Sequence, residues 1–336
     1  MNGTRTNEGG VRRAAALAVL AVLGVIGGTG SEARAESSLP QRTITLVVPT
    51  TPAGGTDAIG RMLAEDIGKR VGRTIVIENK PGANGIVGVE SVAKGPADGS
   101  RLLFTYAASM VVNPALYRKL PYDPLKDFAP IAQVGRGGNL LLVRPDLPAK
   151  TLAEFVAFAK SSPQPLNYCS WGAGSGGHLA MESLKKQAGI DMVHIAYKGS
   201  APCVQDLMGG QVDAGFADSS TTVEIVRSGR VRALAYSGPT RLPMLPDVPT
   251  MNEAGYPFTN YSWYGVFAPA ATPPKIVDEL NQAVTATLKD PAIVKRLNDM
   301  NFNDLPQTTP QSFAETIRKD LADWRTLVEA VGVKLD

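Results

Sequence analysis

The feature that most constrains the fold is an alternation of short apolar, β-branched runs with longer segments of helical periodicity. The first unit has a predicted strand at 43–49, a glycine-rich turn, and a predicted helix at 58–71 with its apolar residues on one face. Predicted strands at 74–78 and 102–106 follow. This alternation is typical of βαβ units and a largely parallel sheet. Near-continuous apolar strands also indicate a sheet covered by helices on both faces.

A second set of such units begins after a proline-rich stretch at 121–130. The run at 139–143 is predicted to be a strand that leaves the first domain. Thr151 and Glu154 then form a capping-box pattern, which predicts a helix start. Four further strands are predicted, at 166–171, 192–197, 214–217 and 231–236. The repeated order of strand, glycine-rich turn and helix predicts two similar α/β domains, and a length of 336 residues agrees with two cores.

The C-terminal part of the chain is predicted to return to the first domain. A strand-like run at 263–268 precedes helical segments, of which two begin at the cap pairs Asp290-Pro291 and Thr309-Pro310. The expected organisation is therefore one lobe from residues 36–138 and 252–336, and a second lobe from residues 139–251.

Residues 1–35 are predicted to be a signal peptide. Arg12 and Arg13 precede an uncharged run, and Ala33-Arg34-Ala35 places small residues at positions −3 and −1 of a cleavage point after Ala35. The apolar segment at 14–26 is shorter than the ~20 residues that a membrane anchor needs. The predicted mature protein is periplasmic or secreted, with Sec and twin-arginine export both open.

Charge argues against nucleic acid or a membrane surface as the partner. The chain has 34 Lys and Arg against 31 Asp and Glu, a net charge of +3. The predicted signal peptide contains four arginines and two glutamates, which leaves +1 for the mature chain. A near-neutral protein lacks the basic stripe that binds phosphate backbones.

Two glycine-rich turns are candidate anion sites. The turns at 49–57 and 170–178 each follow a predicted strand and open a predicted helix. Backbone N–H groups and the positive end of the helix dipole favour a carboxylate or phosphate there, beyond the carboxyl ends of the strands. A turn without a ligand is the alternative for either one alone, but two turns in matching positions favour binding.

Several side chains near these turns are further candidates. Asp57 has two interpretations, as the N-cap of the helix at 58–71 or as a contact for a ligand amine, amide or hydroxyl. Lys198, just beyond a predicted strand end, is either a partner for a ligand carboxylate or a solvated loop residue. Four residues at predicted strand ends are expected either to form the wall of a small pocket or to cap the core: Tyr106, Ser109, Trp171 and Tyr197.

Enzymatic alternatives are weaker. Gly172, Gly174 and Gly177 match G-x-G-x-x-G, but the region about 20 positions on, at 197–199, has no carboxylate for a dinucleotide ribose. Ser175 lies in an approximate nucleophile elbow, so a periplasmic hydrolase remains an alternative. The chain has only His178 and His194, however, and neither is placed like a triad base.

The two cysteines, Cys169 and Cys203, are expected to form a disulfide in an oxidising compartment, with two buried free thiols as the alternative. Together with the two histidines they lack the spacing of a metal site, so neither a metal nor a cofactor is expected.

Taken together, the motifs resemble those of the periplasmic substrate-binding proteins of tripartite tricarboxylate transporters, the Bug family. The resemblance covers essentially the whole mature chain. Its segments are Val48-Pro49 with 53–57, 78–85, Ala97-Asp98-Gly99, 174–179, 197–202, Gly210-Gln211-Val212-Asp213 and 245–250.

The resemblance implies a type II periplasmic-binding-protein fold, in which two α/β lobes close on a small carboxylate. It implies a non-catalytic monomer that passes its ligand to a membrane permease; a ligand sensor for a signalling partner is an alternative. In members that bind amino acids or amides, the residue matching Asp57 meets the polar nitrogen. Cys169, Trp171 and Cys203 depart from the family's small residues, which alters the expected pocket size. The predicted ligand-binding residues are Ala53, Gly54, Gly55, Thr56, Asp57, Ala83, Asn84, Ala108, Ser109, Gly174, Ser175, Gly176, Lys198 and Asp218.

Overall fold

A computed structural model describes residues 1–3, 37–300, 302 and 304–335 of the chain. One compact unit, which begins at Ser38, contains every helix and strand given below. Apart from residues 1–3, the predicted signal peptide and its cleavage point after Ala35 fall outside the described residues. Among the described residues, no helix combines the length and the apolar character that crossing a membrane requires.

The strands of the described residues form two five-stranded sheets. The first sheet has the order β2-β1-β3-β10-β4, in which β1 is parallel to β2 and β3, whereas β10 is antiparallel to β3 and β4. Its strands are β1 (Ile44–Val48), β2 (Ile75–Asn79), β3 (Arg101–Tyr106), β4 (Phe128–Gly137) and β10 (Ser262–Pro269). The second sheet has the order β7-β6-β8-β5-β9, in which β5 is antiparallel to both of its neighbours. Its strands are β5 (Asn139–Val143), β6 (Leu166–Ser170), β7 (Met192–Ala196), β8 (Ala214–Asp218) and β9 (Arg232–Tyr236).

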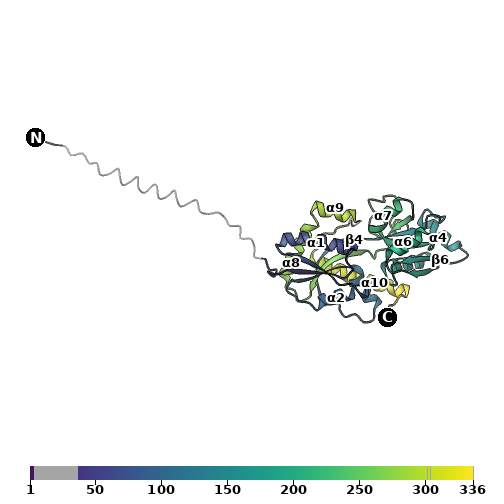
Figure 1. Cartoon of the computed structure of the whole chain (residues 1–336), viewed down its shortest axis with the longest axis horizontal. Coiled ribbons are helices and arrows are strands. Elements are labelled where there is room, and N and C mark those ends of the chain that lie inside the picture. The colour runs from purple at the N-terminus through teal and green to yellow at the C-terminus, as the bar shows by residue number, and fades with distance from the viewer. Residues whose placement is uncertain (4–36, 301, 303, 336) are drawn as a thin grey trace. The chain divides into compact units, whose positions relative to one another are not determined.

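Helices follow most of the strands. Those associated with the first sheet are α1 (Gly55–Val71), η1 (Ala83–Gly85), α2 (Ile86–Ala93), η2 (Ala108–Val112), α3 (Asn113–Leu116), α8 (Pro274–Thr287) and α9 (Pro291–Asp299). Those of the second sheet are α4 (Leu152–Ser161), α5 (Gly176–Ala188), α6 (Ser200–Met208) and α7 (Ser219–Arg227), and the last helix is α10 (Pro310–Val331). Figure 1 shows α1, α8 and α9 on one lobe and α4, α6 and α7 on the other.

Strand periodicity explains how helices cover both faces of the first sheet. Leu46 and Val48 of β1 pack in one apolar cluster with α1 and α8. The residue between them, Val47, belongs to another cluster, together with Val89 and Val92 of α2. Successive strand residues point to opposite faces, so the near-continuous apolar run of β1 is buried on both sides.

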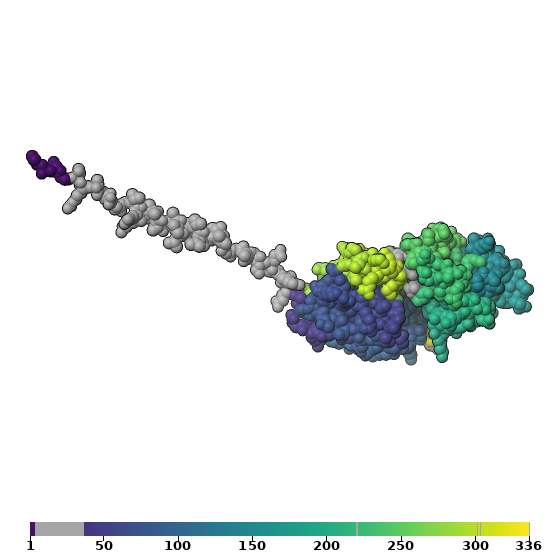
Figure 2. All heavy atoms as spheres, turned by 45° about the horizontal axis from the view of Figure 1, so that its top comes forward, coloured from purple at the N-terminus to yellow at the C-terminus, as the bar shows by residue number. Residues whose placement is uncertain are grey.

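The second sheet is buried in the same way. Leu141 of β5 packs with α4 and α5, whereas its neighbours Leu140 and Leu142 pack in a separate cluster that contains α6 and the two cysteines. In the space-filling view of Figure 2, the teal and green atoms of this lobe form a body beside the purple and blue atoms of the first lobe.

The chain crosses between the sheets at Gly138 and returns between Tyr236 and Ser262. At the crossing, Gly138 N–H donates to the Tyr236 hydroxyl at 2.7 Å, and a Cβ at Gly138 would lie 2.2 Å from Gly238 N. Only a glycine allows the two linking segments to approach this closely. α10 contacts both β4 and η2 of the first lobe and α5 of the second, so one apolar cluster continues through α10 from one lobe to the other.

Sequence predictions of local structure were wrong at the start of α1 and at β4. The helix predicted at 58–71 begins at Gly55, with Gly54 as its N-cap, so Asp57 lies inside the first turn and is not the N-cap. The second error was β4, which the sequence analysis did not identify. Pro130 and several small or polar residues hide its strand pattern; β4 is an edge strand, where a proline is tolerated.

The predicted caps of the late helices are confirmed. The Asp290 side chain accepts from Ala292 N–H, and Thr309 forms a capping box with Ser312. Thr151 accepts from Glu154 N–H as predicted, but the Glu154 carboxylate accepts from Lys150 N–H, so the reciprocal bond of a capping box is not formed.

Candidate functional site

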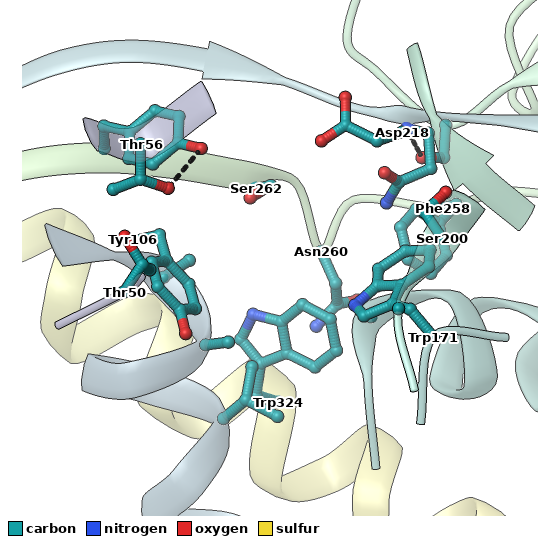
Figure 3. Close-up of a pocket in the computed structure, with 18 residues that line it drawn as sticks. Thr50, Thr56, Tyr106, Trp171, Ser200, Asp218, Phe258, Asn260, Ser262 and Trp324 are labelled. Carbon is teal, nitrogen blue, oxygen red and sulfur yellow. Dashed lines mark hydrogen bonds between the residues drawn. The ribbon is translucent and has the colours of Figure 1, made fainter. Parts of the chain in front are cut away.

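A cavity of about 310 Å³ is enclosed by residues from both sheets and from α10 (Figure 3). Its position agrees with the general rule that ligands bind beyond the carboxyl ends of strands in α/β folds. The residues that form its wall are Thr50, Thr56, Tyr106, Ala107, Ala108, Val112, Asn139, Trp171, Gly176, Gly199, Ser200, Asp218, Ser237, Phe258, Asn260, Ser262, Tyr264 and Trp324. None of these residues is Lys, Arg or His, and Asp218 is the one acidic residue among them.

Three helices begin at this cavity. Thr56 is the second residue of α1, Gly176 is the first residue of α5, and Ser200 is the first residue of α6. The first amide groups of a helix have no partner within the helix, and the helix dipole places a partial positive charge at this end. The cavity therefore has a positive electrostatic contribution from the backbone.

Unpartnered polar atoms concentrate at the same cavity. Among the described residues, eight buried side-chain N or O atoms have no hydrogen-bond partner, and four of the eight belong to the cavity wall. They are Thr50 Oγ1, Ser200 Oγ, Asn260 Nδ2 and Trp324 Nε1. A buried polar atom without a partner costs about 1–3 kcal/mol. An indole or amide N–H can only donate, so Trp324 and Asn260 are suited to an acceptor such as a carboxylate oxygen.

Aromatic rings form much of the remaining wall. Tyr106, Trp171, Phe258 and Tyr264 surround the cavity together with Trp324 (Figure 3). The Tyr264 hydroxyl lies 3.1 Å from Thr56 Oγ1, and this hydrogen bond joins β10 to the first turn of α1. Burial raises the pKa of Tyr264, so its hydroxyl keeps its proton at neutral pH. Such a wall suits a ligand with an apolar or aromatic body and few charged groups.

Asp57 is buried beside this site and is fully engaged by the protein. Its carboxylate accepts from Ala53 N–H, Arg61 Nε and Asn79 Nδ2, each at 2.9 Å. The hydrogen bond from Arg61 is the main cause that lowers the pKa of Asp57 to about 2. Because Ala53 has a positive φ of 65°, the bond from its N–H helps to hold the glycine-rich turn in its conformation.

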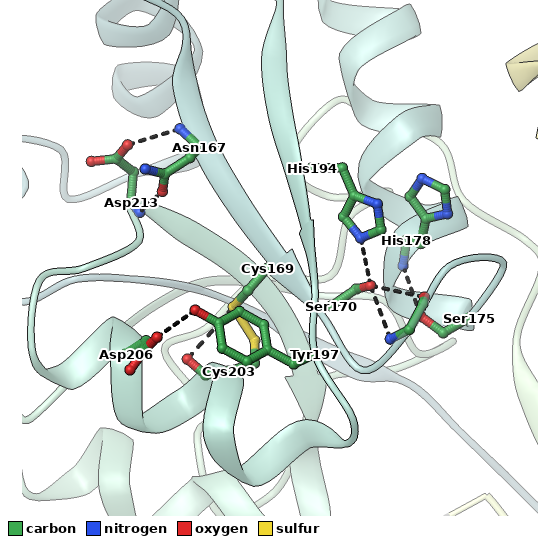
Figure 4. The surroundings of a disulfide bond; sticks show 11 residues. Asn167, Cys169, Ser170, Ser175, His178, His194, Tyr197, Cys203, Asp206 and Asp213 are labelled. Atoms are coloured by element: carbon green, nitrogen blue, oxygen red, sulfur yellow. Dashed lines mark hydrogen bonds between the residues drawn. A yellow bond between two sulfur atoms is a disulfide. The ribbon is translucent and has the colours of Figure 1, made fainter.

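The second glycine-rich turn is held by histidines. His178 and His194 stack with ring centroids 3.9 Å apart. Gly174 N–H donates to His178 Nδ1 at 3.0 Å. His194 Nε2 lies 2.8 Å from Ser170 Oγ (Figure 4). Burial, followed by repulsion from His194, lowers the pKa of His178 to about 4. Burial also lowers the pKa of His194, so both rings are neutral at pH 7, and they support the start of α5.

The hydrolase alternative lacks support from this geometry. Ser175 is the N-cap of α5, and its Oγ accepts from His178 N–H at 3.3 Å. The imidazole of His178 accepts from Gly174, and that of His194 bonds Ser170, a residue with no exposed surface. The described hydrogen bonds therefore pair Ser175 with neither imidazole, whereas a serine nucleophile needs such a base.

Cys169 of β6 and Cys203 of α6 form a disulfide, which confirms that prediction (Figure 4). Both residues have no exposed surface and lie in the apolar cluster between the second sheet and α6. The bond fixes the start of α6, where Gly199 and Ser200 contribute to the cavity wall. It also excludes these thiols as metal ligands, and no cluster of three or more candidate metal ligands occurs among the described residues.

The predicted ligand-binding residues divide into three groups in the structure. Thr56, Ala108, Gly176 and Asp218 form part of the cavity wall. Six others lie in the two glycine-rich turns, between or directly after wall residues in the sequence: Ala53, Gly54, Gly55, Asp57, Gly174 and Ser175.

The third group is not part of the wall, although Ser109 and Lys198 each adjoin a wall residue in the sequence. Ser109 Oγ donates to Asn84 O at 3.3 Å, which brings the η1 turn with Ala83 against η2. Lys198 is exposed and outside the wall. Tyr197, also expected at a pocket wall, instead donates its hydroxyl to Asp206.

Sequence reasoning missed most of the wall contributed by the linking segments and α10. Phe258, Asn260, Ser262 and Tyr264 come from the segment that returns to the first sheet. The aromatic density of that segment, directly before a predicted strand, is the signal that could have identified it. Trp324 lies in an amphipathic helix, where the pattern indicates only a core position.

The fold and this site define the class of a two-lobed α/β binding protein with its cavity between the sheets. The family model described as "Tripartite tricarboxylate transporter family receptor" matches residues 59–333. The chain belongs to this family, a family of periplasmic binding proteins.

Relatives with similar lengths support this assignment. The protein BugT of Bordetella pertussis is 34% identical over 298 residues, which cover 88% of this chain and 91% of BugT. The Rpa4515 protein of R. palustris, solved with adipate, has a TM-score of 0.78 and 33% identity, covering 88% of this chain and 99% of that one. MatC of Rhodopseudomonas palustris, solved with malate, has a TM-score of 0.74 and 34% identity, and the match covers 86% of this chain and 100% of MatC.

Proposed function

We propose that this protein is a periplasmic solute-binding protein, without catalytic activity, that captures a small organic carboxylate in the cavity. It passes the ligand to a membrane permease of the tripartite tricarboxylate type. The lobes at 36–138 with 252–336 and at 139–251 close on the ligand by bending at the segments around Gly138 and 237–261. The near approach of these segments at Gly138 supports a hinge there.

The observation that supports the proposal most is the group of unpartnered donors at a cavity wall without basic side chains. Trp324 is 3% exposed, and its Nε1 has no partner among the described residues. A carboxylate would accept from this N–H and from Asn260, while the first amides of α1, α5 and α6 stabilise its charge. Anion binding then does not require a lysine or arginine.

Calorimetric titration of a carboxylate panel against wild type and Trp324→Phe tests the proposal. The substitution keeps an aromatic ring and removes the N–H, so affinity should fall by about tenfold to a hundredfold, as expected for a hydrogen bond to a charged group. Thr326→Val is the matched control, because Thr326 is exposed on the same helix and outside the cavity wall. If no carboxylate binds, or if Trp324→Phe binds as wild type does, the proposed site is wrong.

A further inference from the structure

The indole of Trp171 is held at the cavity wall by its neighbours. Trp171 directly follows β6, between the buried Ser170 and Gly172. Ser170 Oγ donates to Gly172 O at 2.9 Å, so a hydrogen bond spans Trp171 and holds its backbone. The ring lies against the first turn of α5, where a Cβ at Gly176 would be 3.5 Å from Trp171 Cζ2 and a Cβ at Gly177 would be 2.4 Å from Trp171 Cζ3.

The glycine at position 177 is explained by this indole. The three contacts nearest to a Cβ at Gly177 are all atoms of Trp171, at 2.4, 2.9 and 3.0 Å. Gly177 lies inside α5 and does not have a positive φ, so its backbone conformation does not require glycine. The missing side chain therefore makes room for the indole of Trp171 at the cavity wall.

Aromatic rings gather at this cavity, and most of them have no ring partner in the protein. Five of the eighteen wall residues are aromatic, whereas aromatic residues make up 6% of the chain. Tyr106 and Tyr264 pair with each other, with ring centroids 6.5 Å apart. The other three, Trp171, Phe258 and Trp324, take part in none of the ring pairs of the described residues. A ligand with an aromatic ring would supply the ring contact that these three lack.

Both lobes contribute rings to the wall. Tyr106 ends β3 of the first sheet and Trp171 follows β6 of the second, and in Figure 3 the two stand on opposite sides of the cavity. Closure of the lobes would bring a ring from each side toward a flat ligand. Ser200 Oγ, Asn260 Nδ2 and Trp324 Nε1 have no partner among the described residues and belong to the same wall. A ligand whose carboxylate accepts from these donors therefore has its body within reach of the aromatic wall.

We infer that the ligand is an aromatic carboxylate and that Trp171 selects it by packing its indole against the ligand ring. This inference rests on the proposed function and specifies its ligand class. Aromatic pairs in offset or edge-to-face geometry are favoured beyond the apolar area that they bury. A saturated ring of the same size buries a similar area without this contribution. The ratio of the two affinities therefore separates ring recognition from general hydrophobic binding.

Calorimetric titration of three matched ligand pairs tests the inference. The pairs are benzoate with cyclohexanecarboxylate, phenylacetate with cyclohexylacetate, and terephthalate with trans-cyclohexane-1,4-dicarboxylate. Each pair keeps the number of carboxylates and the connection between ring and carboxylate, and only the ring changes. For the wild type, the aromatic member of at least one pair should bind about threefold to tenfold tighter than the saturated member.

Two substitutions act on the indole in different ways. Trp171→Leu removes it, so the two members of a pair should bind about equally while carboxylate binding persists. Gly177→Ala keeps the indole and displaces it, so it should also lower the ratio, and it serves as the second variant if Trp171→Leu does not fold. Once Trp171→Leu has removed the clash, adding Gly177→Ala should change affinity little further. Phe158→Leu is the control, because this half-buried ring of α4 lies in the same lobe and outside the cavity wall, and it should keep the wild-type ratio.

The outcomes separate the inference from the proposed function. Equal affinities within every pair would overturn the inference, as would binding of open-chain malate or adipate without binding of any aromatic compound; the proposed function would stand in both cases. A ratio that persists in both Trp171→Leu and Gly177→Ala would overturn the role of Trp171. If no carboxylate of the whole panel binds, the proposed function fails as well.

Discussion

Reduction of the Cys169–Cys203 disulfide should destabilise the protein by an amount that can be predicted from the length of the loop that the bond closes. The two cysteines are 34 residues apart in the sequence. Closing a loop of this length lowers the entropy of the unfolded chain by an amount worth about 4 kcal/mol near 25 °C. Because both residues are buried in the same apolar cluster, reduction leaves the packing atoms in place and mainly removes the constraint on the unfolded state.

Urea unfolding followed by far-UV circular dichroism measures the difference. Oxidised protein is compared with protein that is reduced in denaturant, refolded and kept under reductant. The reduced form should lose about 4 kcal/mol, and its melting temperature should fall by about 8 °C. Its dependence on urea should also steepen, because an unfolded chain without a cross-link exposes more surface.

Cys169→Ala/Cys203→Ala is the control for the reductant. Its unfolding curve should not respond to reductant, and it should be less stable than the reduced wild type because each substitution removes a buried sulfur atom. An unchanged urea midpoint for the reduced wild type would refute the reasoning, since the bond would then contribute no constraint. Equal sensitivity of the double variant to reductant would show that the effect comes from elsewhere.

Two further outcomes are expected. The pKa of His178 is lowered from 6.5 to about 4, so between these pH values the unfolded state holds a proton that the folded state lacks. The free energy of unfolding should therefore fall on acidification by about 1.4 kcal/mol per pH unit in this range. His178→Phe should flatten this slope in urea titrations, and an unchanged slope would contradict the assignment. In Gly177→Ala, the added Cβ would lie 2.4 Å from Trp171 Cζ3, so the substitution should shift the fluorescence of Trp171 and weaken ligand binding. In the control Gly209→Ala, the nearest contact of the added Cβ is at 3.5 Å, so neither change is expected.

The sequence predicted most strands because their pattern is local. The alternation of apolar runs and helical periods depends on neighbouring residues, and the cap pairs at Asp290 and Thr309 act within one turn of a helix. β4 was missed because its strand character depends on pairing with β10, more than a hundred residues later in the chain. Edge position and long-range pairing allow a strand to contain Pro130 without the usual local signal.

The candidate site was predicted less completely because the cavity depends on distant segments. The glycine-rich turns indicate where α1 and α5 begin, because a turn and a helix start are local features of the sequence. Asn260 and Trp324 join these turns only through the return of β10 to the first sheet and the packing of α10 across both lobes. Around Trp324, no local pattern distinguishes a wall position from a core position.

Asp57 and Asp218 show why the sequence alone could not rank two acidic candidates. Asp57 lies in the first turn of α1 and Asp218 ends β8 directly before α7, so both lie where a strand leads into a helix and local patterns treat them alike. Their environments differ because Arg61 lies one helical turn after Asp57, and the pairing of Val48 with Asn79 brings the Asn79 amide to the same carboxylate. These contacts use the Asp57 oxygens within the protein, and Asp57 is not part of the cavity wall, whereas Asp218, at the end of β8, is part of it. Strand pairing, which local sequence patterns do not contain, therefore determines which of the two carboxylates lies at the cavity wall.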